Sequence, residues 1–425
     1  MKKILLLGGS AQQVVAIKAA KELGYYTVLC DYLPDNPGQF VADKYYNVST
    51  TDVDAVYEVA KKEQVSGILP YASDPAALPA AIVAERLGLP TNPSKSVEVL
   101  GIKHKFREFL QQHNFASPKT FAFDVNMNAE EVAKNVSLFH FPIVVKPTDS
   151  SGSKGVSIIN DLSQLQKSIE VANEYSRNKI LIAEEFIERG FPSVIGGDIF
   201  VWNGKIELYG LMSCLRGGKG HELVPFGEKK PSLLNEKQEK NVQSELLRLV
   251  SSLNIQFGEL NVEILLDKND NVHFLELGPR AGGNMIPIQL SDAYGVDLVK
   301  ANVLAAMGEN PQLQINEQAG CYFTYVLHSY KKGTFTGVEF SKEIEPYVYR
   351  QVIYKKNGDK VESFDGAGKA CGIIFLHTDT IEQMNYFCEH IEESIIVKLE
   401  DNVLRGGVRR YSKIHVMLPS YRSAA

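Results

Sequence analysis

The chain has 425 residues, of which 44% are hydrophobic and 23% are charged, and its formal net charge is −6. This length exceeds the roughly 250–300 residues at which a single hydrophobic core stops growing, so we expect two or three domains. The composition excludes a disordered or fibrous chain, and without a long basic run or an apolar window of about 18 residues we expect neither nucleic acid nor a membrane as a partner.

The cysteines are scattered and form no CxxC pair; they are Cys30, Cys214, Cys321, Cys371 and Cys388. Such a pattern indicates reduced thiols rather than disulfides or structural zinc. The opening MKKILLLGGS reaches a glycine turn too early for a signal peptide. We therefore expect a cytoplasmic protein.

The first 93 residues alternate between apolar strands and helices. KILLLGG predicts a strand, AQQVVAIKAAKELG a helix and YTVLCDY a second strand, so a doubly wound parallel sheet is expected. Asp31 follows Gly8 at about the spacing of a ribose-binding acid, but Ser10 and Gln13 replace two of the three glycines of the dinucleotide fingerprint. A sheet without a nicotinamide cofactor is favoured, and NAD(P) binding is the alternative.

The segment NPSKSVEVLGIKHKFREFLQQHNFASP predicts one helix from a serine cap to Pro118. FPIVVK and GVSIIN then predict two strands, and the PTDSSGSK between them predicts a hairpin loop of about eight residues, longer than usual. Its Ser and Gly residues leave backbone N–H groups uncovered, with Lys146 and Lys154 at either side, as in a phosphate-binding loop. A mobile polar loop is the alternative, and the Walker motif is absent.

A second hairpin is predicted where LNVEILL and NVHFLEL flank the turn-rich DKNDN. If Lys268 to Asn271 form a four-residue loop, Glu263 faces Glu276. Opposed carboxylates repel by about 3 kcal/mol at ~5 Å and a dielectric of ~20, whereas a divalent cation such as Mg²⁺ would make the pair favourable. A loop of odd length would put the two carboxylates on opposite faces of the sheet.

From about residue 318, CYFTYVLHSY and YVYRQVIYKK predict short aromatic strands. The following ACGIIFLHTDTIEQMNYFCEHIEESIIVKL predicts a strand, a helix and a strand. The tyrosines of this region are expected to pack in a sheet rather than to stack on bases, because no basic groove accompanies them. An α+β closing domain is expected.

Together VVKP, the Ser/Gly loop, LIAEEFIERG and NVEILL with VHFLELGPRAGGN, in this order after a β-α-β domain and KHKFREFL, resemble the ATP-grasp superfamily of carboxylate–amine ligases. The resemblance covers roughly residues 1–310 and points to the carbamoyl-phosphate synthase-like and amino-acid ligase-like group. It implies α/β and α+β architecture: a parallel-sheet domain over 1–93, an ATP-grasp domain over 94–317 and a small α+β domain over 318–425.

The resemblance also implies ATP with Mg²⁺ or Mn²⁺, and assigns site residues. Arg280 and Lys146 would be catalytic, and Glu263 and Glu276 would bind the metal. The implied ATP-binding residues are Lys103, Lys146, Ser150, Ser151, Gly152, Ser153, Lys154, Gly155, Glu184, Glu185, Phe186 and Ile187.

Five positions depart from the family pattern or are weakly specified. Gly278 stands where an Asn usually completes the metal ligands, and Asp198 is only the nearest candidate for a ribose-binding acid. Substrate contacts are expected from Arg216, His221 and Asn284, although the segment around the first two would also suit an ordinary surface loop.

The sequence thus predicts an enzyme that activates a carboxylate as an acyl phosphate and joins it to an amine, releasing ADP and phosphate. The expected partners are small, amino-acid-like molecules, with a homodimer as the assembly to consider. One alternative is a carboxylase or carbamoyl-phosphate-type enzyme that uses bicarbonate. Another, of a different class, is a non-catalytic nucleotide or NAD(P)-binding protein.

Overall fold

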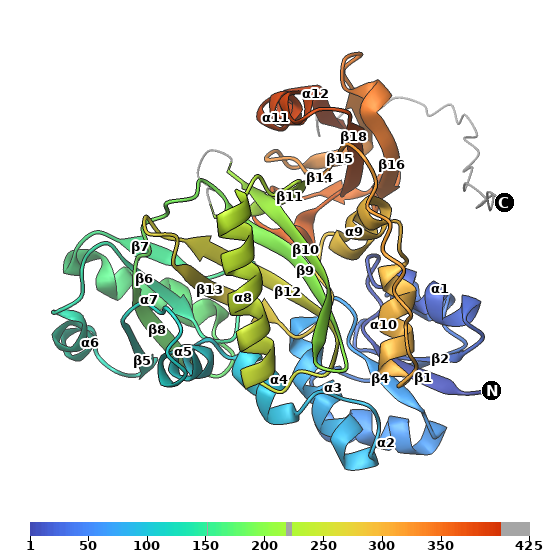
Figure 1. Cartoon of the computed structure of the whole chain (residues 1–425), viewed down its shortest axis with the longest axis horizontal. Coiled ribbons are helices and arrows are strands. Elements are labelled where there is room, and N and C mark those ends of the chain that lie inside the picture. Colours follow the sequence, from blue (N-terminus) through green and yellow to red (C-terminus); the bar gives the residue numbers. More distant parts are fainter. Residues whose placement is uncertain (151, 218–222, 401–425) are drawn as a thin grey trace, which may run out of the picture.

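The computed structural model describes residues 1–150, 152–217 and 223–400. Its N-terminal part is the parallel sheet that the alternating pattern predicts, with strand order β3-β2-β1-β4 (Figure 1). Alternate strand residues enter two apolar clusters, one on each face, because a central parallel sheet is covered by helices on both sides. The elements are β1 (Lys3–Leu7), α1 (Val14–Glu22), β2 (Tyr26–Asp31), η1 (Pro37–Phe40), β3 (Lys44–Asn47), α2 (Val53–Glu63), β4 (Gly67–Leu69) and α3 (Asp74–Leu87).

The single helix expected before Pro118 is wrong, because two helices stand there: α4 (Ser94–Gly101) and α5 (Lys103–Gln112). Between them Ile102 has an extended backbone, with φ −124° and ψ 109°. Gly101 and a β-branched residue make this a weak point in a helix. The break lets the backbone N–H of Lys103 donate to the Thr148 carbonyl at 2.8 Å, which ties the start of α5 to the end of the strand before the Ser/Gly loop.

A small antiparallel sheet follows, with strand order β5-β8-β6-β7. Strands β6 and β7 pair directly, with Val145 opposite Ser157, so the predicted hairpin around PTDSSGSK is confirmed. One face of the sheet packs under α6 and α7, and Val144, Lys146 and Glu184 on the other face line a cavity. The elements are β5 (Thr120–Asp124), α6 (Ala129–Val136), β6 (Ile143–Pro147), β7 (Ser157–Ile159), η2 (Leu162–Gln164), α7 (Leu165–Tyr175) and β8 (Ile180–Glu185).

The largest sheet has the order β13-β12-β9-β10-β11-β14-β18-β16. Figure 1 shows α8 lying across one face, where it covers a large apolar cluster, while α9 and α10 pack on the other. Its first strands and helices are β9 (Val194–Trp202), β10 (Lys205–Arg216), β11 (Pro225–Lys230), α8 (Glu236–Ser252), β12 (Phe257–Leu266), β13 (Val272–Gly278), α9 (Ile286–Tyr294) and α10 (Leu298–Ala306).

The C-terminal part has the predicted strand, helix and strand at β18, α11 and β19. Its strands β14, β16 and β18 extend the large sheet through the β11–β14 pairing, and a three-stranded sheet β17-β15-β19 packs beside them. No helix in residues 1–150, 152–217 and 223–400 has the length and apolar character needed to cross a bilayer. The elements are β14 (Cys321–Leu327), β15 (Gly333–Phe340), η3 (Glu345–Tyr347), β16 (Val348–Ile353), β17 (Lys360–Val361), η4 (Ala367–Lys369), β18 (Gly372–Thr378), α11 (Ile381–Glu389), α12 (Ile391–Ser394) and β19 (Ile395–Glu400).

Candidate active site

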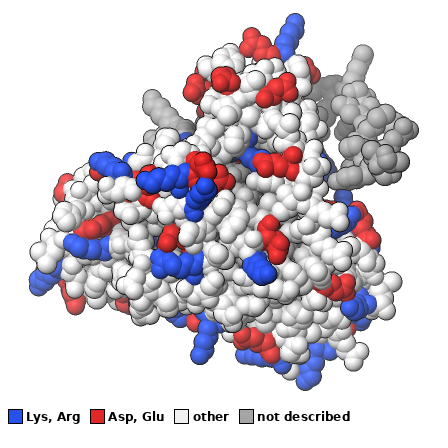
Figure 2. Space-filling view, in the orientation of Figure 1, with Lys and Arg blue, Asp and Glu red and all other residues white. Residues whose placement is uncertain are grey.

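A cavity of about 660 Å³ lies between the small sheet and the large sheet. Strands β6 and β8 form one wall, β12 and β13 form another, and α11 of the C-terminal part contributes three further residues, Asn385, Cys388 and Glu389. Figure 2 shows acidic and basic side chains interspersed over this view of the molecule, without a large patch of one sign. The volume lies within the range of pockets that bind a small-molecule ligand.

The two predicted metal carboxylates face one another, but the predicted loop length is wrong. Leu266 pairs with Val272, so the turn between β12 and β13 has five residues, not four. The register then shifts by one because Leu275 is a β-bulge: Ile264 pairs with Phe274, and Glu263 pairs with Glu276. A five-residue loop without a bulge would put the two carboxylates on opposite faces of the sheet. The bulge puts them on the same face, and both carboxylates reach the cavity.

Each of these carboxylates has a cation beside it. The Nη2 atom of Arg216 lies 2.7 Å from Glu263, and the Nζ atom of Lys103 lies 3.3 Å from Glu276. No cluster of three or more His, Cys, Asp or Glu side chains suited to a metal occurs among the described residues. A pair of hard oxygen donors fits Mg²⁺ or Mn²⁺, because such ions keep waters and phosphate oxygens in their coordination shell. Gly278, opposite Asn261, offers no side-chain ligand.

A chain of buried ion pairs lies behind the cavity wall formed by β6 and β8. Glu184 on β8 pairs with Lys146 on β6 and with Arg107 on α5, where the Nε atom is 2.7 Å from Glu184 Oε1. Burial opposes the ionisation of Glu184, but the two cations outweigh it and lower its pKa to about 2. Burial lowers the pKa of Lys146. The carboxylate of Glu184, one of the predicted ATP-binding residues, is thus paired with two cations of the chain.

The Ser/Gly loop reaches the cavity through Ser150, Gly152 and Ser153, whereas Lys154 is exposed and Gly155 is buried, and neither lines it. The Nζ atom of Lys103 donates to the Ser150 carbonyl at 2.6 Å. Ser151 lies outside the described residues. Positive φ angles at Gly152, Ser153 and Gly155 give the loop its sharp turns.

The predicted ATP-binding residues Glu185, Phe186 and Ile187 line the same cavity. The Glu185 carboxylate accepts a hydrogen bond from the backbone N–H of His140 at 2.9 Å. Burial opposes its ionisation, but its hydrogen bonds outweigh burial and lower its pKa. The backbone N–H of Phe186 donates to the Pro142 carbonyl. The segment between β8 and β9 therefore forms part of the cavity wall.

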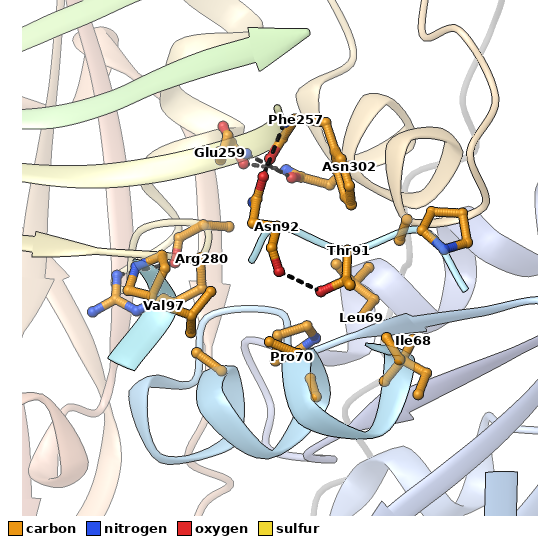
Figure 3. A pocket seen from close by; sticks show the side chains of 18 residues that line it. Ile68, Leu69, Pro70, Thr91, Asn92, Val97, Phe257, Glu259, Arg280 and Asn302 are labelled. Atoms are coloured by element: carbon orange, nitrogen blue, oxygen red, sulfur yellow. Dashed lines mark hydrogen bonds between the residues drawn. The ribbon is translucent and has the colours of Figure 1, made fainter. Parts of the chain in front are cut away.

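Arg280 is not among the residues that line the large cavity. Its Nε and Nη2 atoms donate to the two carboxylate oxygens of Asp74 on α3, each at 2.7 Å. It borders a separate cavity of about 70 Å³ between α3, β4 and β12 (Figure 3), together with Glu259 and Asn302. That cavity is too small for a nucleotide, and burial raises the pKa of Glu259.

The substrate residues are only partly brought together. Arg216 lines the large cavity, His221 lies outside the described residues, and Asn284 does not line it. The backbone N–H of Asn284 donates to the side chain of Gln12, in the turn between β1 and α1, at 3.0 Å. Asp198, the weak ribose candidate, is buried and accepts from Asn261 and from the Gly282 backbone.

Sequence reasoning missed Arg107, Asp74 and Glu228. In the sequence, Arg107 occurs at helical spacing with Leu100 and Leu110. A charged residue on an otherwise apolar helix face indicates a buried cation with a partner, and this pattern could have identified Arg107. Glu228 on β11 is 7% exposed, and burial raises its pKa to about 8. Its side chain lies over Gly196, where an added Cβ would come within 2.8 Å of the carboxylate.

Residues 108–283 match the family described as the ATP-grasp domain. A carbamoyl phosphate synthase large chain from Thermotoga sp. (strain RQ2) is 22% identical over 342 residues, which are 76% of this chain and 30% of that protein. A formate-dependent phosphoribosylglycinamide formyltransferase from Aliivibrio fischeri (strain ATCC 700601 / ES114) is 25% identical over 389 residues, which are 89% of this chain and 93% of that protein. The chain thus spans less than a third of the first relative and nearly all of the second.

Solved structures resemble the whole chain. An L-amino acid ligase from Bacillus licheniformis has a TM-score of 0.79 at 19% identity, covering 94% of this chain and 99% of that one. A phosphoribosylglycinamide synthetase from Anaerococcus prevotii has a TM-score of 0.75 at 20% identity, covering 94% of this chain and 100% of that one. At these identities the likeness establishes the fold alone.

Proposed function

The chain contains an ATP-grasp domain, and on this premise we propose that it is an ATP-dependent ligase that joins a small carboxylate to an amine, releasing ADP and phosphate. The observation that carries the proposal is the cavity in which Glu263 opposes Glu276 while Lys103 and Lys146 line the same space. Paired acids and lysines at one cavity suit a triphosphate with its divalent cation.

The residues divide the work by position. Lys146 and Lys103 neutralise phosphate oxygens, and Ser150, Gly152 and Ser153 cover them and exclude water. Glu263 and Glu276 would hold Mg²⁺ or Mn²⁺, which when bound withdraws charge from the phosphate oxygens. Arg216, beside Glu263, is placed to orient an acidic group near the transferred phosphate.

The proposed reaction has two steps. A carboxylate oxygen attacks the γ-phosphorus, the bond to the β-phosphate oxygen breaks, and ADP leaves. An amine then attacks the acyl carbon, a C–N bond forms, and phosphate departs with the acyl oxygen while the amine loses a proton. Activation is necessary because an oxide ion is too poor a leaving group for direct attack on a carboxylate.

Amino acids are the first substrate class we propose, since an L-amino acid ligase is among the similar structures and has a comparable length. Bicarbonate is the second candidate, because carbamoyl phosphate synthase large chains are among the relatives. Arg280, which Asp74 holds outside the large cavity, would join the reacting oxygens only through a rearrangement, so its catalytic role is the weaker part of the proposal.

The test is ADP release by the purified chain with Mg·ATP across a matrix of carboxylic acids, bicarbonate and amines, with mass spectrometry of each active mixture. Release that needs one organic acid and one amine would support the ligase. Release with bicarbonate alone would favour the second candidate, and NAD(P) binding without ADP release would overturn both. Light scattering of the same sample tests the proposed homodimer.

A further inference from the structure

We propose that Arg107 is a positioning residue of the nucleotide site, fixing Glu276 on one side and Lys146 on the other without touching the ligand. This inference rests on the proposed function, because it concerns residues assigned to the metal and the phosphates. Arg107 is itself absent from the residues that line the large cavity.

The guanidinium group of Arg107 links the two sheets that enclose the cavity. The residue is fully buried, at 0% exposure. Its Nε atom donates to Glu184 of the small sheet at 2.7 Å. On the large sheet, Nη1 donates to the Phe274 carbonyl at 3.1 Å and Nη2 to the Leu275 carbonyl at 3.0 Å. A planar guanidinium group presents these three donors from three separate nitrogens in a fixed fork, whereas an ammonium group presents all its donors from one nitrogen on a flexible stem.

The contacts on the large sheet fall at the β-bulge. Leu275 has no opposite residue on β12, and it is the extra residue that brings Glu276 opposite Glu263. Without Leu275 as an extra residue, the register in which Leu266 pairs with Val272 and Ile264 with Phe274 would continue along the two strands. The carboxylates of Glu263 and Glu276 would then point to opposite faces of the sheet. A bulge interrupts the regular ladder, so a buried donor for its carbonyl stabilises this local backbone.

The contact on the small sheet orients the phosphate-side lysine. Glu184 is held between Arg107 and Lys146, one cation on each carboxylate oxygen. With Arg107 anchored to β13, the carboxylate of Glu184 is fixed, and Lys146 is directed from it toward the cavity. One guanidinium group thereby sets the spacing between the metal side and the phosphate side of the site.

Two substitutions separate this role from general packing. Arg107→Lys keeps a positive charge beside Glu184 but cannot also reach both carbonyls. Arg107→Gln removes the charge and leaves Glu184 balanced by Lys146 alone. Thermal melting of the full chain first establishes a temperature at which each variant is folded, and ADP binding is then measured by calorimetry with and without Mn²⁺.

We expect both variants to weaken ADP binding at least tenfold and to lose most of the gain in affinity that Mn²⁺ gives the wild type. Arg248→Lys is the matched control: Arg248 on α8 also donates to two carbonyls, those of His113 and Asn114, but it lies away from the cavity. Its ADP affinity and its response to Mn²⁺ should equal those of the wild type.

Folded Arg107 variants with wild-type ADP affinity and an unchanged Mn²⁺ response would overturn the inference. So would the failure of both variants to fold at any temperature, because Arg107 would then serve the fold as a whole. Absence of ADP binding by the wild-type chain would instead overturn the proposed function, and this inference with it.

Discussion

Glu263 and Glu276 stand face to face on neighbouring strands, an arrangement that costs about 3 kcal/mol when uncompensated. Arg216 and Lys103 supply the compensation within the chain. A divalent cation would supply it with a single centre and would release both side chains to meet a phosphate or an acid. At the scale of single residues, we therefore expect a divalent cation to replace Arg216 and Lys103 as the counter-charge of the two carboxylates.

Replacing Glu276 with Gln should reduce ADP formation by roughly 100-fold or more, because the metal loses one of two charged ligands. The fold should be retained, since the substitution also removes a like-charge contact. Initial rates at saturating Mg²⁺ measure the effect, with Glu207→Gln, an exposed glutamate on β10, as the control. Appreciable activity of the Glu276 variant would contradict the metal role.

Replacing Lys146 with Met should weaken ADP binding by about tenfold or more, since a buried charge beside the phosphates is lost. Glu184 keeps Arg107 as a partner, so the chain should still fold. Calorimetry measures the affinity, and Lys205→Met, an exposed lysine on β10, provides the comparison. Equal affinities for the two variants would remove Lys146 from the site.

Glu228 should make stability fall as pH rises. Burial raises its pKa from 4.5 to about 8, so between these values the folded chain binds a proton that the unfolded chain has released. The free energy of unfolding should therefore fall by up to roughly 1.4 kcal/mol per pH unit from this group. Urea unfolding of the wild type and of Glu228→Gln at pH 5 to 8 tests this. The free energy of unfolding of Glu228→Gln minus that of the wild type should rise with pH, and a constant difference would refute the prediction.

Lys103, Lys146 and the two carboxylates, which the sequence assigns to one site, line the same cavity, and each occurs in a short segment with a strong local pattern. The sequence could not locate contacts between distant segments. The pairing of Arg280 with Asp74 joins positions about 200 residues apart, and no local spacing predicts it.

At the scale of elements, the sequence predicted whether a segment is a helix or a strand better than it predicted where helices end and how strands are in register. Strands, helices and their order follow from apolar periodicity, and these expectations were confirmed for the parallel sheet and for both hairpins. The split between α4 and α5 depends on a tertiary contact of Lys103 with Thr148. The bulge at Leu275 depends on buried contacts with α5, so the correct opposition of the carboxylates was predicted from an incorrect loop.

Strand β11 pairs with β14, so the large sheet runs across the boundary between the proposed domains 94–317 and 318–425. Truncating the chain at this boundary should therefore destabilise the sheet. Lys229 pairs with Phe323 and Lys230 with Tyr322, so a fragment of residues 1–317 would expose a strand edge. We expect this fragment to aggregate, while the chain 1–400 remains monodisperse or dimeric. Size-exclusion chromatography distinguishes these outcomes, and a well-behaved, ADP-binding 1–317 fragment would show that the central domain is autonomous.

In the whole molecule, the N-terminal sheet is joined to the large sheet through a polar contact as well as an apolar one. Arg280, which follows β13, pairs through two hydrogen bonds with Asp74 at the start of α3. Ala281, Val299 and Val303 complete the apolar side of this interface. The position of the N-terminal sheet is therefore coupled to the segment that follows Glu276.

Replacing Asp74 with Ala should lower the free energy of unfolding by about 2–3 kcal/mol, because it leaves the Arg280 charge largely buried without this partner. Asp54→Ala is the control, since its ion pair with Arg86 is exposed and such pairs contribute at most about 1 kcal/mol. Calorimetric melting compares the two variants. A shift no larger for Asp74 than for Asp54 would show that the apolar contacts alone hold the interface.

The ion pairs of Glu263 and Glu276 have a consequence for the sequence of events at the site. A free divalent ion would have to displace Arg216 and Lys103 from these carboxylates without bringing an anion to receive the two cations. A metal–nucleotide complex brings its own anionic oxygens, onto which the displaced side chains can move. Under the proposed function we therefore expect the order of addition to matter: the ion and the nucleotide should bind together as one complex, and a divalent ion added before the nucleotide should bind weakly.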